Sequence, residues 1–269
     1  MKSLALHSYK GGTGRTTISA NIAALLAKDG NNVAILDMDF WSPTIHTIFR
    51  TKSKSAFVHE YLSGEIDYHE LFTDLTSAFD LPGRLLVGVG DSRIDVIRQN
   101  LEHDREWYQN ALARLLYLKE KLSDEGIDYF IMDCSPGIHS CTVNAIVACD
   151  LTLVLCRVNN FDIDGTIQLR EGLYNRLDKE TTLLFNMVPS QMMQKSRLSQ
   201  VEETIEESCG QDSVISGYLQ YYPEIPLGMG VEIHALTQPS LGFVTDLKMV
   251  VSRLSIVANY ATSAIGEQI

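Results

Sequence analysis

The chain has 269 residues and is acidic, with 22 Lys and Arg against 34 Asp and Glu and a formal net charge of −12. Hydrophobic residues make up 45% and charged residues 21%, which excludes a disordered or fibrous protein and indicates a globular one. The acidic balance argues against a general polyanion binder, because a phosphate backbone is bound by surplus Lys and Arg.

Cysteine usage and hydropathy predict the compartment. Five cysteines, with no secretory signal at the N-terminus, favour a reducing cytosol over a disulfide framework. The most apolar internal stretch, 143–158, is interrupted by Asp150 and Arg157, whereas a bilayer-spanning helix needs about 20 apolar residues. We therefore expect a cytoplasmic protein that does not span a membrane.

Short apolar runs alternate with amphipathic stretches along the chain. Residues 4–6 predict a strand, a glycine-rich turn follows, and the apolar face of 16–29 predicts a helix that ends at Gly30 and Asn31. Later strands are predicted at 33–36, 85–89, 129–132, 151–155, 183–185 and 214–215, and helices at 107–122, 163–177, 198–208 and 244–265. This alternation is typical of a parallel sheet covered on both faces. We predict one α/β domain over 1–269, with a doubly wound, mostly parallel sheet.

Ligands bind such sheets beyond the carboxyl ends of the strands, and a glycine-rich loop, SYKGGTGRTT at 8–17, follows the first strand. Glycines let consecutive backbone N–H groups form an anion nest, and the next helix adds its positive dipole end. The generic pattern G-x-x-x-x-G-K-[ST] is missed twice, because Tyr9 replaces the first glycine and Arg15 the lysine. The alternative is a glycine turn that caps an ordinary helix; three glycines, the consecutive threonines Thr16 and Thr17, and the strand–loop–helix order favour a phosphate loop.

Four motifs in order resemble those of the ParA/MinD family of deviant P-loop ATPases. Residues 10–17 resemble its KGGxGK[ST]T loop, 35–39 its strand that ends in D-x-D, and 131–137 its second switch. Asn186 ends a strand where the family has its adenine-recognising Asn, and 219–225 is similar to the loop beside the base. The resemblance implies a P-loop NTPase fold that binds ATP and Mg²⁺.

The resemblance also implies a role for each matched residue. Lys10, Asp39 and Asp133 are the implied catalytic residues: Lys10 reaches across a dimer to the partner's phosphates, and Asp39 orients the attacking water. Thr16 ligates Mg²⁺, which Asp37 and Asp133 support through its waters. The implied nucleotide contacts are Gly11, Gly12, Thr13, Gly14, Arg15, Thr16, Thr17, Asn186, Leu219, Gln220 and Tyr221. For Asp37 and Asp39 the alternative is a pair of strand-end carboxylates that cap a helix or turn.

Arg15 is the main departure from the family pattern. A guanidinium group is planar, bulkier than an ammonium group and prone to bidentate pairing. It still neutralises phosphate. We therefore expect nucleotide binding to survive and hydrolysis to be slow or dependent on a partner.

Two groups of side chains leave alternatives open. Cysteines without any C-x-x-C pair favour small buried thiols over a metal cluster: Cys134, Cys141, Cys149 and Cys156. Tyrosines near the proposed adenine edge are as consistent with the end of a core strand as with base stacking: Tyr218, Tyr221 and Tyr222.

Few cations are available for an extended anionic surface. The C-terminal helix carries only Lys248 and Arg253, which makes membrane binding of the MinD kind unlikely. Together with Lys195 and Arg197 these side chains leave DNA binding open, but the charge does not support it. An unidentified protein partner or activator is the favoured partner.

The leading functional prediction is an ATP-dependent homodimer, an ATPase that hydrolyses ATP slowly and positions or partitions other cellular components. The alternative is a non-hydrolysing, nucleotide-bound scaffold, such as a polar localisation factor for a surface appendage. A third alternative, a reductase or metallochaperone relative, would need bridging cysteines.

Overall fold

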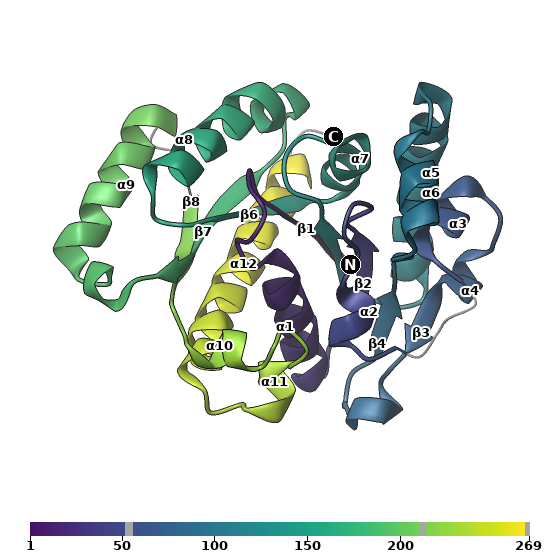
Figure 1. Ribbon diagram of the computed structural model, residues 1–269, viewed down its shortest axis with the longest axis horizontal. Coiled ribbons are helices and arrows are strands. Elements are labelled where there is room, and N and C mark those ends of the chain that lie inside the picture. The colour runs from purple at the N-terminus through teal and green to yellow at the C-terminus, as the bar shows by residue number, and fades with distance from the viewer. Residues whose placement is uncertain (52–55, 210–213, 267–269) are drawn as a thin grey trace.

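The computed structural model describes residues 1–51, 56–209 and 214–266, and one twisted sheet runs through its centre (Figure 1). The sheet has eight strands in the order β3-β4-β2-β5-β1-β6-β7-β8. Their bounds are β1 (Lys2–His7), β2 (Val33–Met38), β3 (Phe72–Asp74), β4 (Leu85–Gly88), β5 (Tyr129–Cys134), β6 (Leu151–Cys156), β7 (Thr181–Val188) and β8 (Val214–Gln220). All neighbours are parallel except β3, which runs antiparallel to β4.

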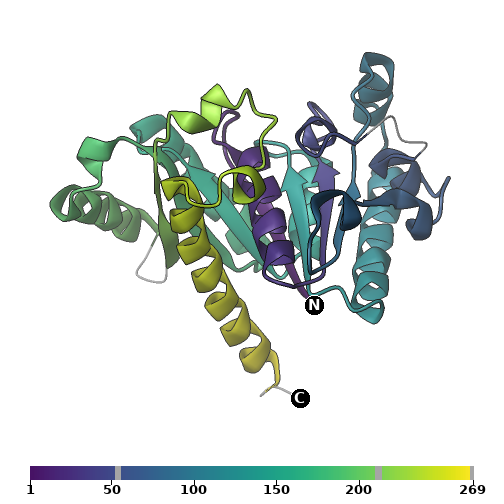
Figure 2. The same ribbon diagram turned by 90° about the horizontal axis from the view of Figure 1, so that it is seen from below.

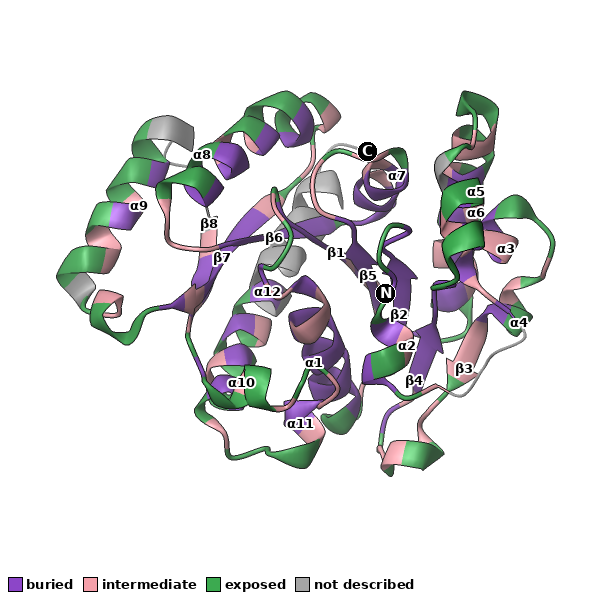
Figure 3. Cartoon of the chain, viewed as in Figure 1, coloured by how far each residue is buried: buried purple, intermediate pink, exposed green. Residues whose placement is uncertain are grey.

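Helices cover both faces of the sheet, so the strands are buried on both sides. On β2, the side chains of Ala34 and Leu36 join one apolar cluster, and those of Val33 and Ile35 join the other. The first cluster lies under α3, α6, α7 and α8, and the second under α1, α2, α11 and α12 (Figures 2 and 3). A strand buried on both faces is a continuous apolar run, which explains why the sequence predicts these strands well.

The α-helices have the following bounds: α1 (Arg15–Lys28), α2 (Ile45–Ile48), α3 (Val58–Ser63), α4 (Tyr68–Leu71), α5 (Ile94–Leu101), α6 (Arg105–Asp124), α7 (Ser140–Ala148), α8 (Asn160–Leu169), α9 (Lys195–Cys209), α10 (Glu224–Leu227), α11 (His234–Thr237) and α12 (Gly242–Gly266). Short 3-10 turns lie at Ser77–Phe79, Asn175–Leu177 and Ser190–Met192. None of the helices in the described part of the chain combines the length and the apolar character needed to cross a bilayer.

The predicted fold class is confirmed, and two local features differ from the prediction. Strand β3 was not predicted, because it has three residues, none of them fully buried, and pairs only with β4. The helix predicted at 163–177 is three segments: α8, a π-helical turn at Arg170–Tyr174 and a 3-10 turn at Asn175–Leu177. π-Helical turns within helices are often found beside functional sites.

Candidate functional site

Four strands of the sheet deliver polar side chains to one edge. The phosphate loop begins directly after β1, Asp37 and Asp39 lie at the end of β2, Asp133 lies near the end of β5, and Asn186 lies near the end of β7. The parallel register pairs Asp133 with both Leu6 and Asp37. Residues about a hundred positions apart in the sequence therefore meet at the carboxyl edge, where sheets of this kind bind ligands.

The loop delivers free backbone amides to this edge. Gly14 is the N-cap of α1 and has a left-handed backbone with φ of 89°, and no side chain caps the first turn. A Cβ at Gly14 would lie 2.5 Å from Nδ2 of Asn186, so only glycine fits between the loop and β7. An uncapped helix N-terminus behind a glycine loop binds anions through its N–H groups and its dipole.

Arg15 is buried and connects three parts of the site. Its Nε donates to the carbonyl oxygen of Cys134 at 2.9 Å, and one terminal nitrogen donates to the carbonyl oxygen of Lys10 at 3.1 Å and to Oγ of Ser8. The other terminal nitrogen lies 3.9 Å from Oδ2 of Asp39. A planar group with several donors makes these contacts together, whereas a lysine ammonium is a point charge.

Asp133 is the buried carboxylate nearest to the loop hydroxyls. Burial raises its pKa to about 7, although hydrogen bonds from Thr16 and Ser19 and the charge of Arg15 oppose the shift. Within the described structure its Oδ1 has no hydrogen-bond partner. A buried oxygen without a partner, beside a threonine hydroxyl at a phosphate loop, is a donor set suited to Mg²⁺. The residues present therefore fit the metal that the family implies.

Asp37 and Asp39 both accept backbone hydrogen bonds, so the capping role considered for them is present. The carboxylate of Asp37 accepts from the backbone N–H groups of Thr44 and Ile45, each at 3.1 Å, and burial followed by the charge of Asp133 raises its pKa well above the ordinary value. Asp39 lies closer to the loop: Oδ1 accepts from Oγ of Ser135 at 2.8 Å, and Oδ2 faces Arg15. This contact joins the end of β2 to the segment after β5.

Lys10 lies against the first turn of α8 of its own chain. Its Nζ is 3.8 Å from Oδ1 of Asp162 and 5.1 Å from the centre of the Phe161 ring. Asp162 is buried and accepts from Nε of Arg157 at 2.7 Å. The side chain of Lys10 remains 42% exposed, so it is held by the chain without being enclosed.

A second compartment of the site opens between β7, β8 and α10. This pocket has about 740 Å³ of empty space and is lined by Gly14, Thr17, Ile18, Asn186, Met187, Gln220, Tyr221, Tyr222, Ile225, Pro226, Gly230 and Phe243. Asn186 donates to the carbonyl oxygen of Thr13 at 2.8 Å, which ties the pocket to the phosphate loop. A mostly apolar cleft with few polar groups is typical of a site for a planar ring system.

The proposed base-side residues do not all face this pocket. Leu219 is fully buried and is not among the lining residues. Tyr218 stacks on Phe185 with ring centres 5.3 Å apart and donates to Glu202, so it belongs to the core side of β8. Tyr221 lines the pocket and is 51% exposed.

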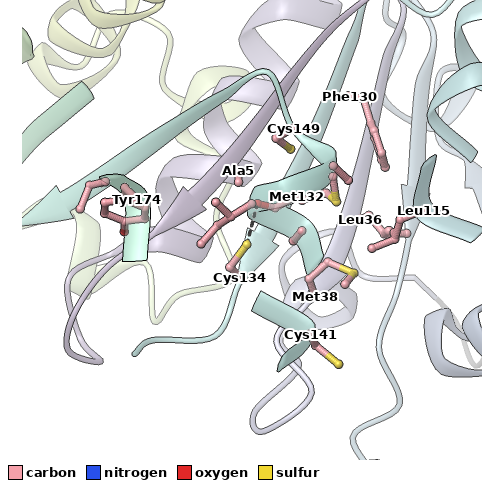
Figure 4. Close-up of a cluster of buried hydrophobic side chains, with 14 of the residues drawn as sticks. Ala5, Leu36, Met38, Leu115, Phe130, Met132, Cys134, Cys141, Cys149 and Tyr174 are labelled. Carbon is pink, nitrogen blue, oxygen red and sulfur yellow. Dashed lines mark hydrogen bonds between the residues drawn. The ribbon is translucent and has the colours of Figure 1, made fainter. Parts of the chain in front are cut away.

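The cysteines lie among apolar side chains (Figure 4). Cys134, Cys141, Cys149 and Cys156 are buried free thiols. Burial raises the pKa of Cys141 and Cys156 to about 12, which keeps these thiols protonated. No group of three or more His, Cys, Asp and Glu side chains that could together hold a metal ion lies among the described residues.

Sequence reasoning missed the serines that hold the charged groups. Ser8 accepts from Arg15, Ser135 donates to Asp39, and Ser19, whose hydroxyl donates to the carbonyl oxygen of Thr16 at 3.1 Å, lies beside Asp133. Ser19 follows Thr16 by three positions, so both hydroxyls fall on one side of α1. Ser135 lies inside the segment that resembles the second switch, so the signal was present in the motif.

The fold and the site define a P-loop α/β nucleotide-binding protein. Residues 1–184 match the family model AAA_31, described as an AAA domain, and the chain belongs to this family. The resemblance to ParA/MinD P-loop ATPases is confirmed.

Known proteins resemble parts or all of the chain. An uncharacterized ATP-binding protein of Methanocaldococcus jannaschii is 32% identical over 67% of this chain and 66% of that protein. The flagellum site-determining protein YlxH of Helicobacter pylori is 28% identical over 57% of this chain and 47% of that protein. The chain thus spans between about half and two thirds of these relatives' lengths. The Mg-ADP complex of the septum site-determining protein MinD from Pyrococcus horikoshii has the same fold, with a TM-score of 0.73, 14% identity and coverage of 97% of this chain and 98% of that one.

Proposed function

We propose that the chain is a cytoplasmic ATPase that binds ATP with Mg²⁺ and forms a nucleotide-driven homodimer that positions or partitions other cellular components. The observation that carries the proposal is the buried oxygen of Asp133 without a partner, next to Thr16 at the end of the phosphate loop. The neighbouring apolar pocket, which Asn186 and Tyr221 line, supports the proposed nucleotide binding.

The site residues divide the work between binding and reaction. The amides of residues 11–14 and the guanidinium group of Arg15 would bind the phosphates, and Thr16 with Asp133 would hold the metal. Bound Mg²⁺ supplies charge neutralisation on the phosphate oxygens. Asp39 would orient the attacking water. Asp37 would support the metal through its bound waters, and its hydrogen bonds from the backbone N–H groups of Thr44 and Ile45 fix the turn before α2.

The dimer is proposed from Lys10. The side chain of Lys10 is 42% exposed and its Nζ lies 3.8 Å from Asp162, so a rotation of the side chain would release it from Asp162. In the proposed dimer Lys10 reaches the phosphates bound by the partner subunit. Each site would then be completed by the second chain.

We propose that hydrolysis is slow, and a specific observation favours the non-hydrolysing scaffold as the second candidate. Arg15 is committed to Cys134, Lys10 and Ser8 and lies close to Asp39, so its charge is shared between phosphate binding and the loop itself. The name of the flagellum site-determining relative points to a localisation role of this kind. Robust steady-state phosphate release by the pure protein would eliminate the scaffold.

The proposed partner is a protein. The net charge of −12 disfavours an extended anionic surface. Of the four cations considered for DNA, Arg253 donates to the carbonyl oxygen of Ser216, and the side chain of Lys195 lies outside the described residues. The side chains of 255–266, which the membrane argument also concerns, lie outside them too.

Calorimetric titration with ADP, with and without Mg²⁺, tests the metal and nucleotide site. We expect Mg²⁺ to strengthen ADP binding about tenfold in the wild-type chain and not in Asp133→Asn, because the amide lacks the negative oxygen that the ion needs. Asp91→Asn is the matched control, since Asp91 is a buried carboxylate that pairs with Arg93 and is not among the residues proposed to bind nucleotide or metal. Absence of nucleotide binding by the wild-type chain would overturn the proposal.

A further inference from the structure

The residues around the end of β1 are fastened to the α8 region at several points. His7 is fully buried; its Nε2 donates to the carbonyl oxygen of Gly137, and its Nδ1 accepts from the hydroxyl of Tyr174 on the π-helical turn. Burial lowers the pKa of His7 to about 4, so the ring is neutral and can donate and accept in this way. Lys10, three residues later, contacts Phe161 and Asp162 in the first turn of α8.

Tyr9 lies between these two contacts, and its ring lies directly on Gly165 of α8. A Cβ at Gly165 would fall 1.9 Å from Cδ1 and 2.3 Å from Cε1 of the Tyr9 ring, a separation that no pair of carbon atoms tolerates. The phosphate loop therefore carries a bulky residue where the generic pattern has glycine, and α8 carries glycine where the bulky residue lies. The two positions are matched in size.

The Tyr9 contact does not belong to the apolar core. Tyr9 is 37% exposed and is a member of neither buried cluster, so its contribution to global stability is small. Gly165 is buried in the middle of α8, where glycine weakens a helix by about 1 kcal/mol relative to alanine. Gly165 thus weakens α8, and the contact with Tyr9 adds little to global stability. We infer that the contact between the loop and α8 serves another purpose than stability.

We propose that Tyr9 is a positioning residue: its ring on Gly165 fixes the phosphate loop to α8, so that nucleotide binding in the loop orders α8. The inference rests on the proposed nucleotide binding and adds the element that responds to it. The hydrogen bonds of His7 to Tyr174 and Gly137, together with the Tyr9 contact, make α8 and the π-helical turn follow the loop as one unit, also when Lys10 leaves Asp162. Gly137, bonded to His7, brings the second switch into the same unit.

The test is a double-mutant cycle with Gly165→Ala, Tyr9→Ala and the double variant. Gly172→Ala is the matched control, because Gly172 lies on the same helical segment, is exposed and has open space around an added Cβ. Each protein is titrated with ADP and Mg²⁺, and amide hydrogen exchange of residues 160–174 is followed with and without the nucleotide. Thermal unfolding of each protein reports on the fold.

In the wild-type chain and the control we expect nucleotide to slow exchange across α8. In Gly165→Ala the added methyl group displaces the Tyr9 ring. Because residues in contact are energetically coupled, we expect the affinity for ADP to fall about tenfold and the protection of α8 against exchange to be lost. In the double variant no ring is left to displace, so its affinity for ADP should equal that of Tyr9→Ala.

Two results would overturn the inference while the proposed function stands. One is wild-type binding with unchanged exchange in α8, and the other is a Gly165→Ala protein that matches Gly172→Ala in both affinity and exchange. A double variant that binds more weakly than Tyr9→Ala by the same factor that separates Gly165→Ala from wild type would also overturn it, because the defect would then not involve Tyr9. A wild-type chain that binds no nucleotide overturns the proposed function and the inference together.

Discussion

The phosphate side and the base side of the site are built from different chemistry. The phosphate side buries four ionisable groups near one another: Arg15, Asp37, Asp39 and Asp133. The base side presents the amides of Asn186 and Gln220 and the half-exposed ring of Tyr221 in a mostly apolar pocket. Charged groups are concentrated where a polyphosphate and a metal would lie, and an apolar pocket lies where a ring would bind.

This difference explains how an acidic chain offers a site for a polyanion. The net charge of −12 belongs to the whole surface, whereas the phosphate side depends on local amides, one guanidinium group and a metal. The buried carboxylates destabilise the empty site, because burial and mutual repulsion raise the pKa values of Asp37 and Asp133. Substitutions that remove charge on the phosphate side should therefore have larger effects on function or stability than substitutions that remove contacts on the base side.

The largest expected effect is on the phosphate side, at Asp39. We expect Asp39→Asn to reduce the rate of phosphate release about 100-fold or more while ATP affinity changes less than about threefold, because the amide cannot orient water as the carboxylate does. Phosphate release and ATP titration measure the two quantities. Asp91→Asn again serves as the control for loss of a buried carboxylate. Equal rates in wild type and Asp39→Asn would remove Asp39 from the mechanism.

The second expected effect is a pH dependence that belongs to Asp133. Its folded pKa of about 7 lies above the ordinary value of 3.8, so the folded chain holds a proton that the unfolded chain has lost between these pH values. The stability of the empty wild-type chain should therefore fall as pH rises from about 4 to about 7, relative to Asp133→Asn, and the difference should be constant above that range.

Between pH 5 and pH 8 the stability of the wild-type chain should fall relative to Asp133→Asn by on the order of 3 kcal/mol in the free energy of unfolding. Urea unfolding of both proteins over this range, without nucleotide or metal, measures the change. Asp150→Asn is the control: its bond to Lys119 lowers the pKa of Asp150 despite partial burial, so this variant should be destabilised by an amount that does not depend on pH in this range. A difference independent of pH would contradict a raised pKa at Asp133.

The smallest effects are expected on the base side. Asn186→Ala should weaken ATP binding about tenfold, because it removes the amide and its bond to Thr13. Tyr221→Ala should weaken binding about threefold, and Tyr221→Phe should match wild type if the ring face is what contacts the base. Titrations with ATP measure all three variants. A larger loss in Tyr221→Ala than in Arg15→Ala would reverse the comparison between the two sides.

The sequence predicts well those parts of the site in which the local structure requires one type of residue. Gly14 must be glycine for its backbone and for its approach to Asn186, and β2 must be apolar because both faces are covered. Both needs are visible as a motif or a periodicity in a short window of sequence.

The parts that sequence could not predict depend on partners far away in the chain. The contact of Tyr9 with Gly165 joins two positions that are separated in the sequence by strands β2 to β6, and nothing in the sequence near either residue indicates the other. The inward direction of Leu219 and Tyr218 follows from the pleat and bulges of β8 against β7, which a motif does not specify. β3 is too short and too exposed to leave a periodic signal.

The central claim is that nucleotide drives two chains together through Lys10. Light scattering during size-exclusion chromatography tests it most directly, with Asp39→Asn used to preserve bound ATP and with Lys10→Ala added to it. We predict twice the mass of one chain with ATP and Mg²⁺, the mass of one chain with ADP, and the mass of one chain for the Lys10→Ala variant under both conditions. A mass that stays the same with and without bound ATP would contradict the account.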